Sequence, residues 1–250
     1  MINPKRVIVN ADDYGSNSSI NRAIIALFDR GVVNSTTIMA NMPGFLDAVE
    51  LAHRYKIINR IGIHLVLTEG KPLTQRIGEI SYLFNKKENL SRIRTRKLFF
   101  LGRKERSIIY QELAAQIEKV KKEGIRISHI DTHHQLHDSL SLLKIIIDLL
   151  KTYKISSVRI LNNLERKNMI KNTYRDTINR YLKYRKLNYS DFLGDQIDFM
   201  SMFKKNPLLF NKRKVEIMVH PDFDVNGDVV DKVGKKEYGF EFLHIMNSYK

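Results

Sequence analysis

The 250-residue sequence predicts an α/β protein whose mostly parallel strands form a β/α barrel, either complete or incomplete and distorted. Two observations lead to this fold class. Strand-like apolar segments alternate with helix-like segments, which is the order that right-handed crossovers between parallel strands require. Ionisable side chains follow the strand-like segments directly, and parallel α/β proteins place their functional residues there.

The first part of the chain contains three strand-like segments separated by two helical ones. Residues 6–10 form an apolar strand, and the apolar positions of residues 20–28 recur at the i, i+3, i+4 spacing of one buried helical face. Residues 32–39 predict a second strand, residues 45–55 a short helix and residues 60–66 a third strand. This order predicts a parallel sheet with right-handed crossovers.

The same two kinds of element continue after a long connection. In order, they are a helix over 107–123, a strand over 125–130, a helix over 140–153, strands over 157–160 and 215–219, and a terminal helix over 241–248. Gly124 follows the first of these helices, and Ser139 is placed to cap the second.

Two basic segments interrupt the alternation. Residues 86–106 contain nine Lys and Arg side chains against two acids, and residues 162–214 contain thirteen against five. No strand is predicted within residues 162–214. We therefore predict a single catalytic domain over residues 1–250, with basic insertions at about 68–106 and 162–214 that form a cap at the entrance of the site.

Composition limits the kind of site and the location of the protein. The chain has no cysteine, so a metal site must use His, Asp or Glu side chains. No apolar stretch has the length of a membrane span, and no apolar signal region precedes the first strand. We expect a cytoplasmic protein without a membrane span.

Carboxylates and imidazoles recur where the predicted strands end. Five of the eight histidines lie at or just after a strand end, and they accompany three aspartates. One Asp with two His side chains and open water positions is a donor set for a catalytic divalent metal. Because successive side chains of an extended chain point to opposite sides, Asp12 and Asp13 are expected to face in different directions. We interpret His53, His129 and His244 as structural, and expect His137 behind the ligands or facing solvent.

Several motifs resemble those of the YdjC-like carbohydrate deacetylases, a family that includes chitooligosaccharide deacetylase. They are Asn10-Ala11-Asp12-Asp13-Tyr14-Gly15, Gly62-Ile63-His64-Leu65-Val66-Leu67-Thr68, Gly70-Lys71-Pro72-Leu73, Asp131-Thr132-His133-His134 and His220-Pro221, and they extend over nearly the whole chain. The resemblance implies a barrel related to polysaccharide deacetylases and one divalent ion, Mg²⁺ or Zn²⁺, held by Asp13, His64 and His133. It also implies removal of an acetyl group from an N-acetylglucosamine unit, a role in chitin degradation, and a homodimer.

Two positions depart from the family pattern. Gln135 stands where the family often has a third consecutive histidine, and we do not expect it to be a ligand. Asp222 follows His220-Pro221 where a small residue is more usual. Its additional carboxylate is expected near the mouth of the pocket.

The chemistry of amide hydrolysis suggests roles for the remaining residues. The reaction needs a nucleophilic water, a polarised carbonyl and a proton for the leaving amine, and a divalent ion can supply the first two. We assign Asp12 as the general base and His220 as the general acid, with Arg159 orienting Asp12. Asp131 and His134 are expected behind the ligands, where Asp131 would orient His133 or His134.

Three functions are compatible with these residues. The first is metal-dependent removal of an acetyl group from an N-acetylglucosamine-type sugar or short chito-oligosaccharide. The second keeps the site but acts on another acylated amine or ester, including an anionic or lipid-linked sugar, which the net charge of +16 would favour. The third is a basic nucleic-acid-binding protein without hydrolase activity. It leaves the strand-end Asp and His residues unexplained, so we expect no nucleic-acid partner.

Overall fold

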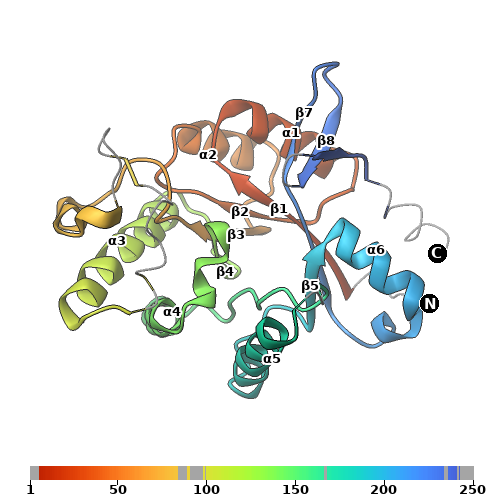
Figure 1. Ribbon diagram of the computed structural model, residues 1–250. Helices are drawn as coiled ribbons and strands as arrows, with labels where there is room; N and C mark the ends of the chain where they lie inside the picture. Colours follow the sequence, from red (N-terminus) through yellow and green to blue (C-terminus); the bar gives the residue numbers. More distant parts are fainter. Residues whose placement is uncertain are drawn as a thin grey trace. The chain divides into compact units, whose positions relative to one another are not determined.

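A computed structural model describes residues 6–83, 89–90, 98, 100–165, 168–233, 236–240 and 242 (Figure 1). Its larger sheet has six strands in the order β4-β3-β2-β1-β6-β5. These are β1 (Val7–Tyr14), β2 (Ser35–Ile38), β3 (Ile61–Leu65), β4 (Ile130–Thr132), β5 (Phe192–Asp195) and β6 (Val215–Val219). The pairs β1–β6, β3–β4 and β5–β6 are parallel. Since β4 and β5 end the order, the predicted α/β class is confirmed in its incomplete-barrel form.

The chain divides into two compact units by its internal contacts. One unit comprises residues 1–12, 19–36 and 159–250, and the other comprises residues 13–18 and 37–158. The boundary within β1 falls between Asp12 and Asp13. The single catalytic domain over residues 1–250, with its cap, stays a prediction.

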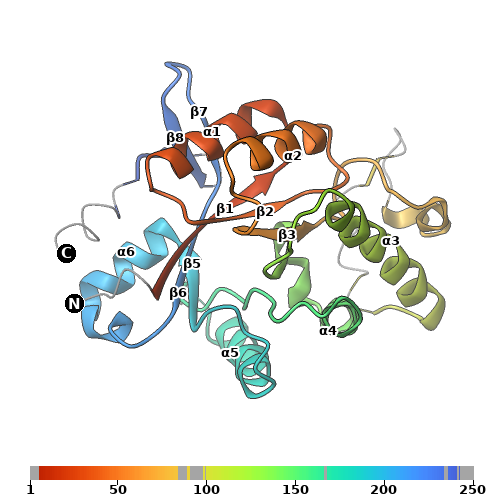
Figure 2. The same ribbon diagram turned by 180° about the vertical axis from the view of Figure 1, so that it is seen from behind.

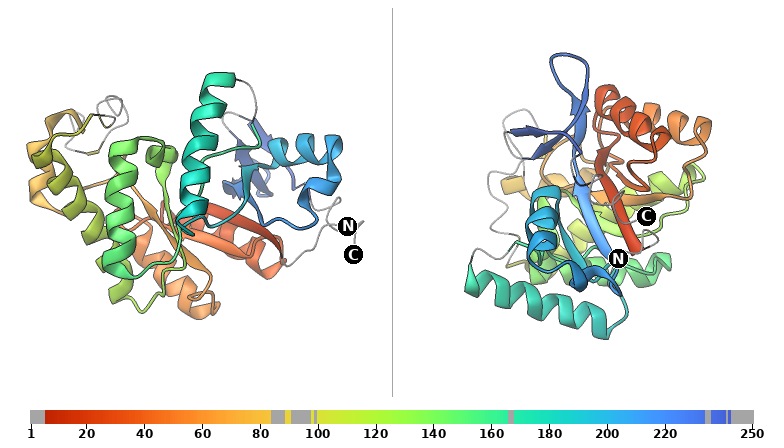
Figure 3. Two further views of the ribbon diagram at one scale, coloured as in Figure 1. Left: turned by 90° about the horizontal axis from the view of Figure 1, so that it is seen from below. Right: turned by 90° about the vertical axis from the view of Figure 1, so that its right-hand side faces the viewer.

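The first unit contains most of β1 together with β6, β5 and three helices. The helices are α1 (Ser18–Asp29), α5 (Met169–Tyr184) and α6 (Gln196–Lys205). α6 packs against β5 and β6 and buries Phe199, whose ring centroid is 5.4 Å from that of Phe210. A small antiparallel sheet follows β6, made of β7 (Pro221–Phe223), β8 (Val229–Val233) and β9 (Lys236–Tyr238). The hairpin of β7 and β8 projects from this unit (Figure 3).

The second unit contains β3, β4 and three helices. The helices are α2 (Phe45–Arg54), α3 (Arg103–Lys122) and α4 (Leu140–Tyr153), with short 3-10 turns η2 (Gln75–Glu79), η3 (Ser81–Leu83) and η5 (His133–Asp138). α3 and α4 lie side by side (Figures 2 and 3). α4 begins as predicted, because the Ser139 hydroxyl accepts a hydrogen bond from the Leu142 backbone N–H. Seven of its eight Leu and Ile side chains are buried, all except Leu140, and each buried one stabilises the fold by about 1.5–3 kcal/mol.

The structure corrects the prediction that residues 162–214 contain no strand. β5 lies within this range and pairs in parallel with β6. Gly194 and Asp195 are poor strand formers, so the local sequence gives little signal for a strand here. A Cβ at Gly194 would lie 2.8 Å from the Cβ of Asp198 in α6, which shows how closely the helix covers this strand.

Other predicted elements are shorter than expected or lie elsewhere. Only Ile130 of the strand predicted over 125–130 belongs to β4, and the strand predicted over 157–160 is reduced to a parallel bridge between Val158 and Ile130. The antiparallel sheet of β7, β8 and β9 had no counterpart among the predictions. The terminal helix predicted over 241–248 lies outside the described residues except at Phe242, and so does most of the basic segment 86–106.

A close contact between β3 and His129 gives a first test of the fold. A Cβ at Gly62 would lie 2.5 Å from Cε1 of the fully buried His129 ring. Gly62→Ala is therefore expected to destabilise the protein by about 1–3 kcal/mol, as overpacking does, in a urea unfolding experiment. Gly78→Ala is the control, because a Cβ there meets nothing within 4 Å. Equal stabilities of Gly62→Ala and the native protein would contradict this packing.

None of the helices in the described part of the chain is both long enough and apolar enough to span a lipid bilayer.

Candidate active site

The end of β1 directs two neighbouring carboxylates to different partners. Asp13 has a φ of 68°, in the left-handed region that Asp tolerates better than most residues. The expected alternation of an extended strand therefore does not describe this pair, because Asp13 is not extended. Gly15 turns the chain next, with a φ of 91°. A Cβ at this position would lie 2.9 Å from the Met39 carbonyl oxygen, which is too close for any other residue. Backbone conformation, and not strand periodicity, separates the two aspartates.

Three potential metal ligands face one another in the second unit. Asp13 Oδ1 lies 3.3 Å from His64 Nε2 and 3.0 Å from His133 Nδ1, and the two imidazole nitrogens are 3.2 Å apart. Ligands bonded to one divalent ion at about 2.0–2.2 Å stand roughly 3.0–3.5 Å from each other. Asp13 Oδ1 is also buried without a well-directed hydrogen bond. These three side chains therefore fit a single divalent ion.

The ionisation of these side chains is coupled. Burial favours the neutral form of Asp13, but contacts with His133 and His64 hold its pKa well below the ordinary value. Burial also disfavours a charged His133, yet Asp13 and Glu69 together raise the pKa of its imidazole. Each of the two groups thus favours the charged form of the other.

Each imidazole is oriented through its other nitrogen. His64 Nδ1 lies 2.6 Å from Oδ1 of the buried Asp131, and the Thr37 hydroxyl donates to Asp131 Oδ2 at 3.0 Å. This leaves His64 Nε2 directed at Asp13. His133 Nε2 contacts the Glu69 carboxylate in the same manner, which leaves its Nδ1 directed at Asp13.

Asp131 orients a different imidazole from the one expected. The sequence suggested His133 or His134, which are close along the chain, whereas the carboxylate contacts His64. The parallel register of β3 and β4 sets His64 directly opposite Asp131 and therefore decides the partner.

Loss of the Asp131 charge is expected to weaken metal binding. Asp131→Asn should bind a divalent ion about 10–100-fold less tightly, because the uncharged amide makes His64 a poorer ligand. Calorimetric titration with Zn²⁺ measures the affinity. Asp148→Asn is the matched control, since that exposed carboxylate on α4 pairs only loosely with Lys151 at 3.6 Å. Native affinity in Asp131→Asn would show that this contact does not tune the ligand.

Four other histidines of the described residues lie outside the triad and away from His220 in the sequence. His134 is exposed, and its ring contacts that of His133 at an interplanar angle of 48° with centroids 3.8 Å apart. Its Nδ1 lies 3.0 Å from the Thr68 hydroxyl. His137 is buried with Nδ1 2.7 Å from the Thr132 hydroxyl, so of the two positions expected for it the solvent-facing one is wrong. His129 is buried and His53 bonds the Glu123 carbonyl at 2.8 Å, both outside the triad. His244 lies outside the described residues.

In the first unit, Arg159 bridges the carboxylates of Asp12 and Glu216. Its buried guanidinium donates to Asp12 Oδ2 at 2.6 Å and to Oδ1 at 2.7 Å, and its Nε donates to Glu216 Oε1 at 2.7 Å. Asn10 Nδ2 adds a bond of 2.8 Å to Asp12 Oδ1. Asp12 is therefore fixed in one orientation, and both of its oxygens are occupied by strong donors.

His220 follows β6 and approaches the same carboxylate. Its Nε2 lies 3.9 Å from Asp12 Oδ2, and about a third of its side chain is exposed. The backbone N–H of His220 donates to Asp231 Oδ1 at 2.7 Å, and Gln196 donates to Asp231 Oδ2 at 2.7 Å. β8 and α6 thus hold the segment that carries this imidazole.

The carboxylate of Asp222 has partners on both sides. It accepts from the Ser19 hydroxyl in α1 at 2.9 Å and from Lys232 Nζ in β8 at 2.9 Å, and these contacts offset its burial and lower its pKa. The residue therefore joins α1 to the small sheet. Its expected position near the mouth of the pocket stays a prediction.

The structure adds Glu69, Glu216 and Thr37, which the sequence interpretation missed. Glu216 had a recognisable signal, since it is a lone acid inside an apolar strand. Glu69 directly precedes the motif Gly70-Lys71-Pro72-Leu73. Thr37 carried no comparable signal within its strand.

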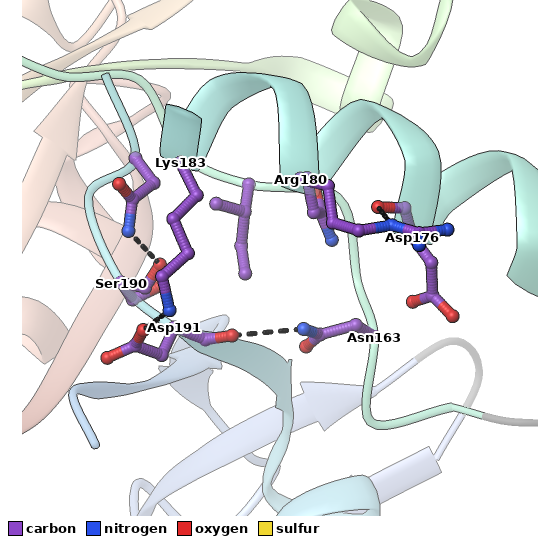
Figure 4. Close-up of a pocket in the computed structure, with 9 residues that line it drawn as sticks. Asn163, Asp176, Arg180, Lys183, Ser190 and Asp191 are labelled. Carbon is purple, nitrogen blue, oxygen red and sulfur yellow. Dashed lines mark hydrogen bonds and ion pairs between the residues drawn. The ribbon is translucent and has the colours of Figure 1, made fainter. Parts of the chain in front are cut away.

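A cavity beside α5 is separate from these residues. It has a volume of about 360 Å³ and is lined by polar side chains of α5 and of the segment before β5 (Figure 4). Lys183 pairs with Asp191 at 2.9 Å, and Asn163 donates to the Asp191 carbonyl at 3.0 Å. These groups bond to one another, and none of the predicted site residues lines the cavity.

Comparison with known families decides where the chain belongs. A family model described as YdjC-like protein matches residues 6–241. The chain belongs to the YdjC-like family. A carbohydrate deacetylase of Vibrio cholerae serotype O1 is 32% identical over 97% of this chain and 88% of its own length. A carbohydrate deacetylase from Brevibacillus brevis is 29% identical over 87% of this chain and 82% of its own length. The predicted family and enzyme class are confirmed.

A solved structure shares the fold. It is a crystal structure from Enterococcus faecalis V583, whose name proposes a cellobiose-phosphate cleavage protein. It matches with a TM-score of 0.69 and 26% identity, covering 88% of this chain and 82% of the other.

Proposed function

We propose that this YdjC-like protein is a metal-dependent hydrolase that removes the acetyl group from an N-acetylglucosamine-type sugar or a short chito-oligosaccharide. The observation that carries the proposal is the mutual spacing of Asp13 Oδ1, His64 Nε2 and His133 Nδ1, all between 3.0 and 3.3 Å. The names of the curated relatives, which are carbohydrate deacetylases, support the substrate class.

Asp13, His64 and His133 would hold the ion, with Asp131 and Glu69 behind the two imidazoles. When bound, Zn²⁺ or Mg²⁺ would polarise the amide carbonyl and make water a stronger nucleophile. His134 packs on His133 and would limit the movement of that ring.

The acid–base steps would be carried out by side chains of the first unit. Asp12 would accept a proton from the attacking water, and Arg159 keeps the carboxylate in place through two hydrogen bonds. His220 would donate a proton to the amine nitrogen as the C–N bond breaks, giving free amine and acetate. Its Nε2 lies 3.9 Å from Asp12 Oδ2, so base and acid are neighbours.

A direct assay tests the proposal. The purified protein, loaded with Zn²⁺ or Mg²⁺, should release acetate from N-acetylglucosamine or its β-1,4-linked oligomers, and chelation should abolish the release. Absence of acetate release from all of these sugars with either metal would refute the proposed function. A role in chitin degradation, a cytoplasmic location and a homodimer belong to the same proposal.

A second candidate substrate is an anionic sugar. The net charge of +16 favours it, and the solved relative is named for a sugar phosphate. Parallel assays with neutral and phosphorylated N-acetylated disaccharides distinguish the two substrates. Salt-dependent retention on nucleic acid, without any acetate release, would instead favour the nucleic-acid-binding alternative.

A further inference from the structure

Helix α5 of the first unit carries a row of exposed apolar and aromatic side chains. Ile170, Tyr181 and Tyr184 are separated by eleven and three positions, so they share one face of the helix. Their exposed fractions are 80%, 42% and 85%, and Met169 at the start of the helix is 82% exposed. Large side chains gathered on one exposed face mark an interaction site.

The opposite face of α5 anchors the helix and keeps this row directed outward. Arg175, Ile178 and Leu182 are buried on that face. Asn179 donates to the Leu161 carbonyl and accepts from the Leu161 N–H, both at 2.8 Å. Rotation of α5 about its axis would break these contacts, so the row stays exposed as long as the helix is packed.

Two threonines lie within the row, and their hydroxyls are already bonded inside the helix. The Thr173 hydroxyl donates to the Met169 carbonyl at 3.0 Å, and the Thr177 hydroxyl donates to the Thr173 carbonyl at 2.8 Å. Burying a hydroxyl costs free energy mainly when it loses its hydrogen bond. This face can therefore enter a less polar environment without leaving these groups unpaired.

Cationic side chains border the row. Four of them are exposed and form no ion pair with a carboxylate in the part of the chain that the structure describes: Lys171, Arg180, Arg185 and Lys186. Arg180 Nε donates to the Asp176 carbonyl of the preceding turn at 3.3 Å (Figure 4), and Arg185 Nη1 bonds the Tyr181 hydroxyl at 3.1 Å. Asp176 is the single acid within α5. The face is therefore apolar along its centre and positively charged at its edges.

A bilayer that contains anionic phospholipid fits both properties. Amphipathic helices bind in the plane of such a surface by burying apolar side chains among the headgroups, while Lys and Arg meet the lipid phosphates. Tyrosine is enriched at this interface. A second copy of the chain would bring like charges together, and nucleic acid would offer Ile170 and Met169 no apolar surroundings. We propose that α5 is a membrane-docking helix that lies on an anionic bilayer. This inference is independent of the proposed hydrolase activity.

Sedimentation of the full-length protein with lipid vesicles tests the docking helix. Vesicles that contain phosphatidylglycerol should bind the native protein about tenfold or more tightly than pure phosphatidylcholine vesicles, because each nearby cation contributes about fivefold at an anionic surface. The difference should shrink as salt is added, since salt screens exposed charges.

Two pairs of substitutions separate the apolar from the charged contribution. Ile170→Ser combined with Tyr184→Ser should lower binding about tenfold or more by removing apolar surface at unchanged charge. The matched control is Leu208→Ser combined with Val225→Ser, because these side chains are 73% and 100% exposed but lie outside α5.

The charged edges have their own variant and control. Arg180→Gln combined with Lys186→Gln should lower binding to phosphatidylglycerol vesicles about tenfold or more. Lys204→Gln combined with Lys205→Gln removes the same charge from the end of α6 in the same unit and should keep the native affinity.

Equal binding to neutral and anionic vesicles would overturn the inference, and so would native binding by a folded Ile170→Ser, Tyr184→Ser variant. A dimer in light scattering that this variant loses, without vesicle binding, would assign the row to a second copy instead. Salt-dependent retention on nucleic acid without vesicle binding would likewise overturn it. Acetate release from a soluble sugar should be equal in the variant and the native protein, so the docking helix and the proposed function can fail separately.

Discussion

Asp12→Asn is expected to retain its metal and to lose turnover by about a hundredfold or more, which is the effect of removing a general base. The amide keeps the size of the carboxylate, but it cannot accept a proton from water. Arg159 keeps one anionic partner, because Glu216 still accepts from its Nε at 2.7 Å. Metal analysis of the purified variant and acetate release under saturating substrate measure the two properties separately.

Stability must be followed in the same variant. Breaking one side of a buried ion pair can cost about 3–5 kcal/mol, so activity should be measured well below the unfolding midpoint. Asp13→Asn is the matched comparison, and it should lose metal, with activity partly restored by excess metal. If Asp12→Asn were metal-depleted while Asp13→Asn kept its metal but was inactive, Asp12 would be the ligand and Asp13 the base. Near-normal turnover in Asp12→Asn would exclude Asp12 as the base.

His64→Ala is expected to lose bound metal and about a thousandfold or more of its activity together. A divalent ion contributes several kcal/mol of transition-state stabilisation, and each 1.36 kcal/mol corresponds to a tenfold change in rate. His64 is buried, and its Nε2 lies within 3.3 Å of both Asp13 Oδ1 and His133 Nδ1. Its removal leaves two ligands where three were available.

Metal content and chelation distinguish this effect from unfolding. After chelation, addition of Zn²⁺ should restore the metal content and the activity of the native protein. It should restore neither in His64→Ala. His53→Ala serves as the control, because this exposed imidazole bonds only to the Glu123 backbone carbonyl among the contacts of the described residues. Full metal occupancy in a folded His64→Ala would remove His64 from the ligand set.

The sequence by itself determined the fold class and the places where ionisable residues gather. Alternating apolar periodicities are local properties, so the order of strands and helices could be recognised from short windows. The ends of parallel strands meet at one edge of a sheet, which is why residues as distant in sequence as His64 and His133 could be expected together. The structure brings these two imidazole nitrogens to 3.2 Å.

Only the tertiary structure decided which groups support these residues. The register of β3 against β4 sets Asp131 opposite His64, and the left-handed backbone of Asp13 separates it from Asp12. β5 forms because β6 and α6 cover Gly194 and Asp195, whose own strand propensity is poor. Glu216 meets Arg159 although 57 residues separate them. Such partners depend on non-local pairing, for which a single local stretch of sequence carries no signal.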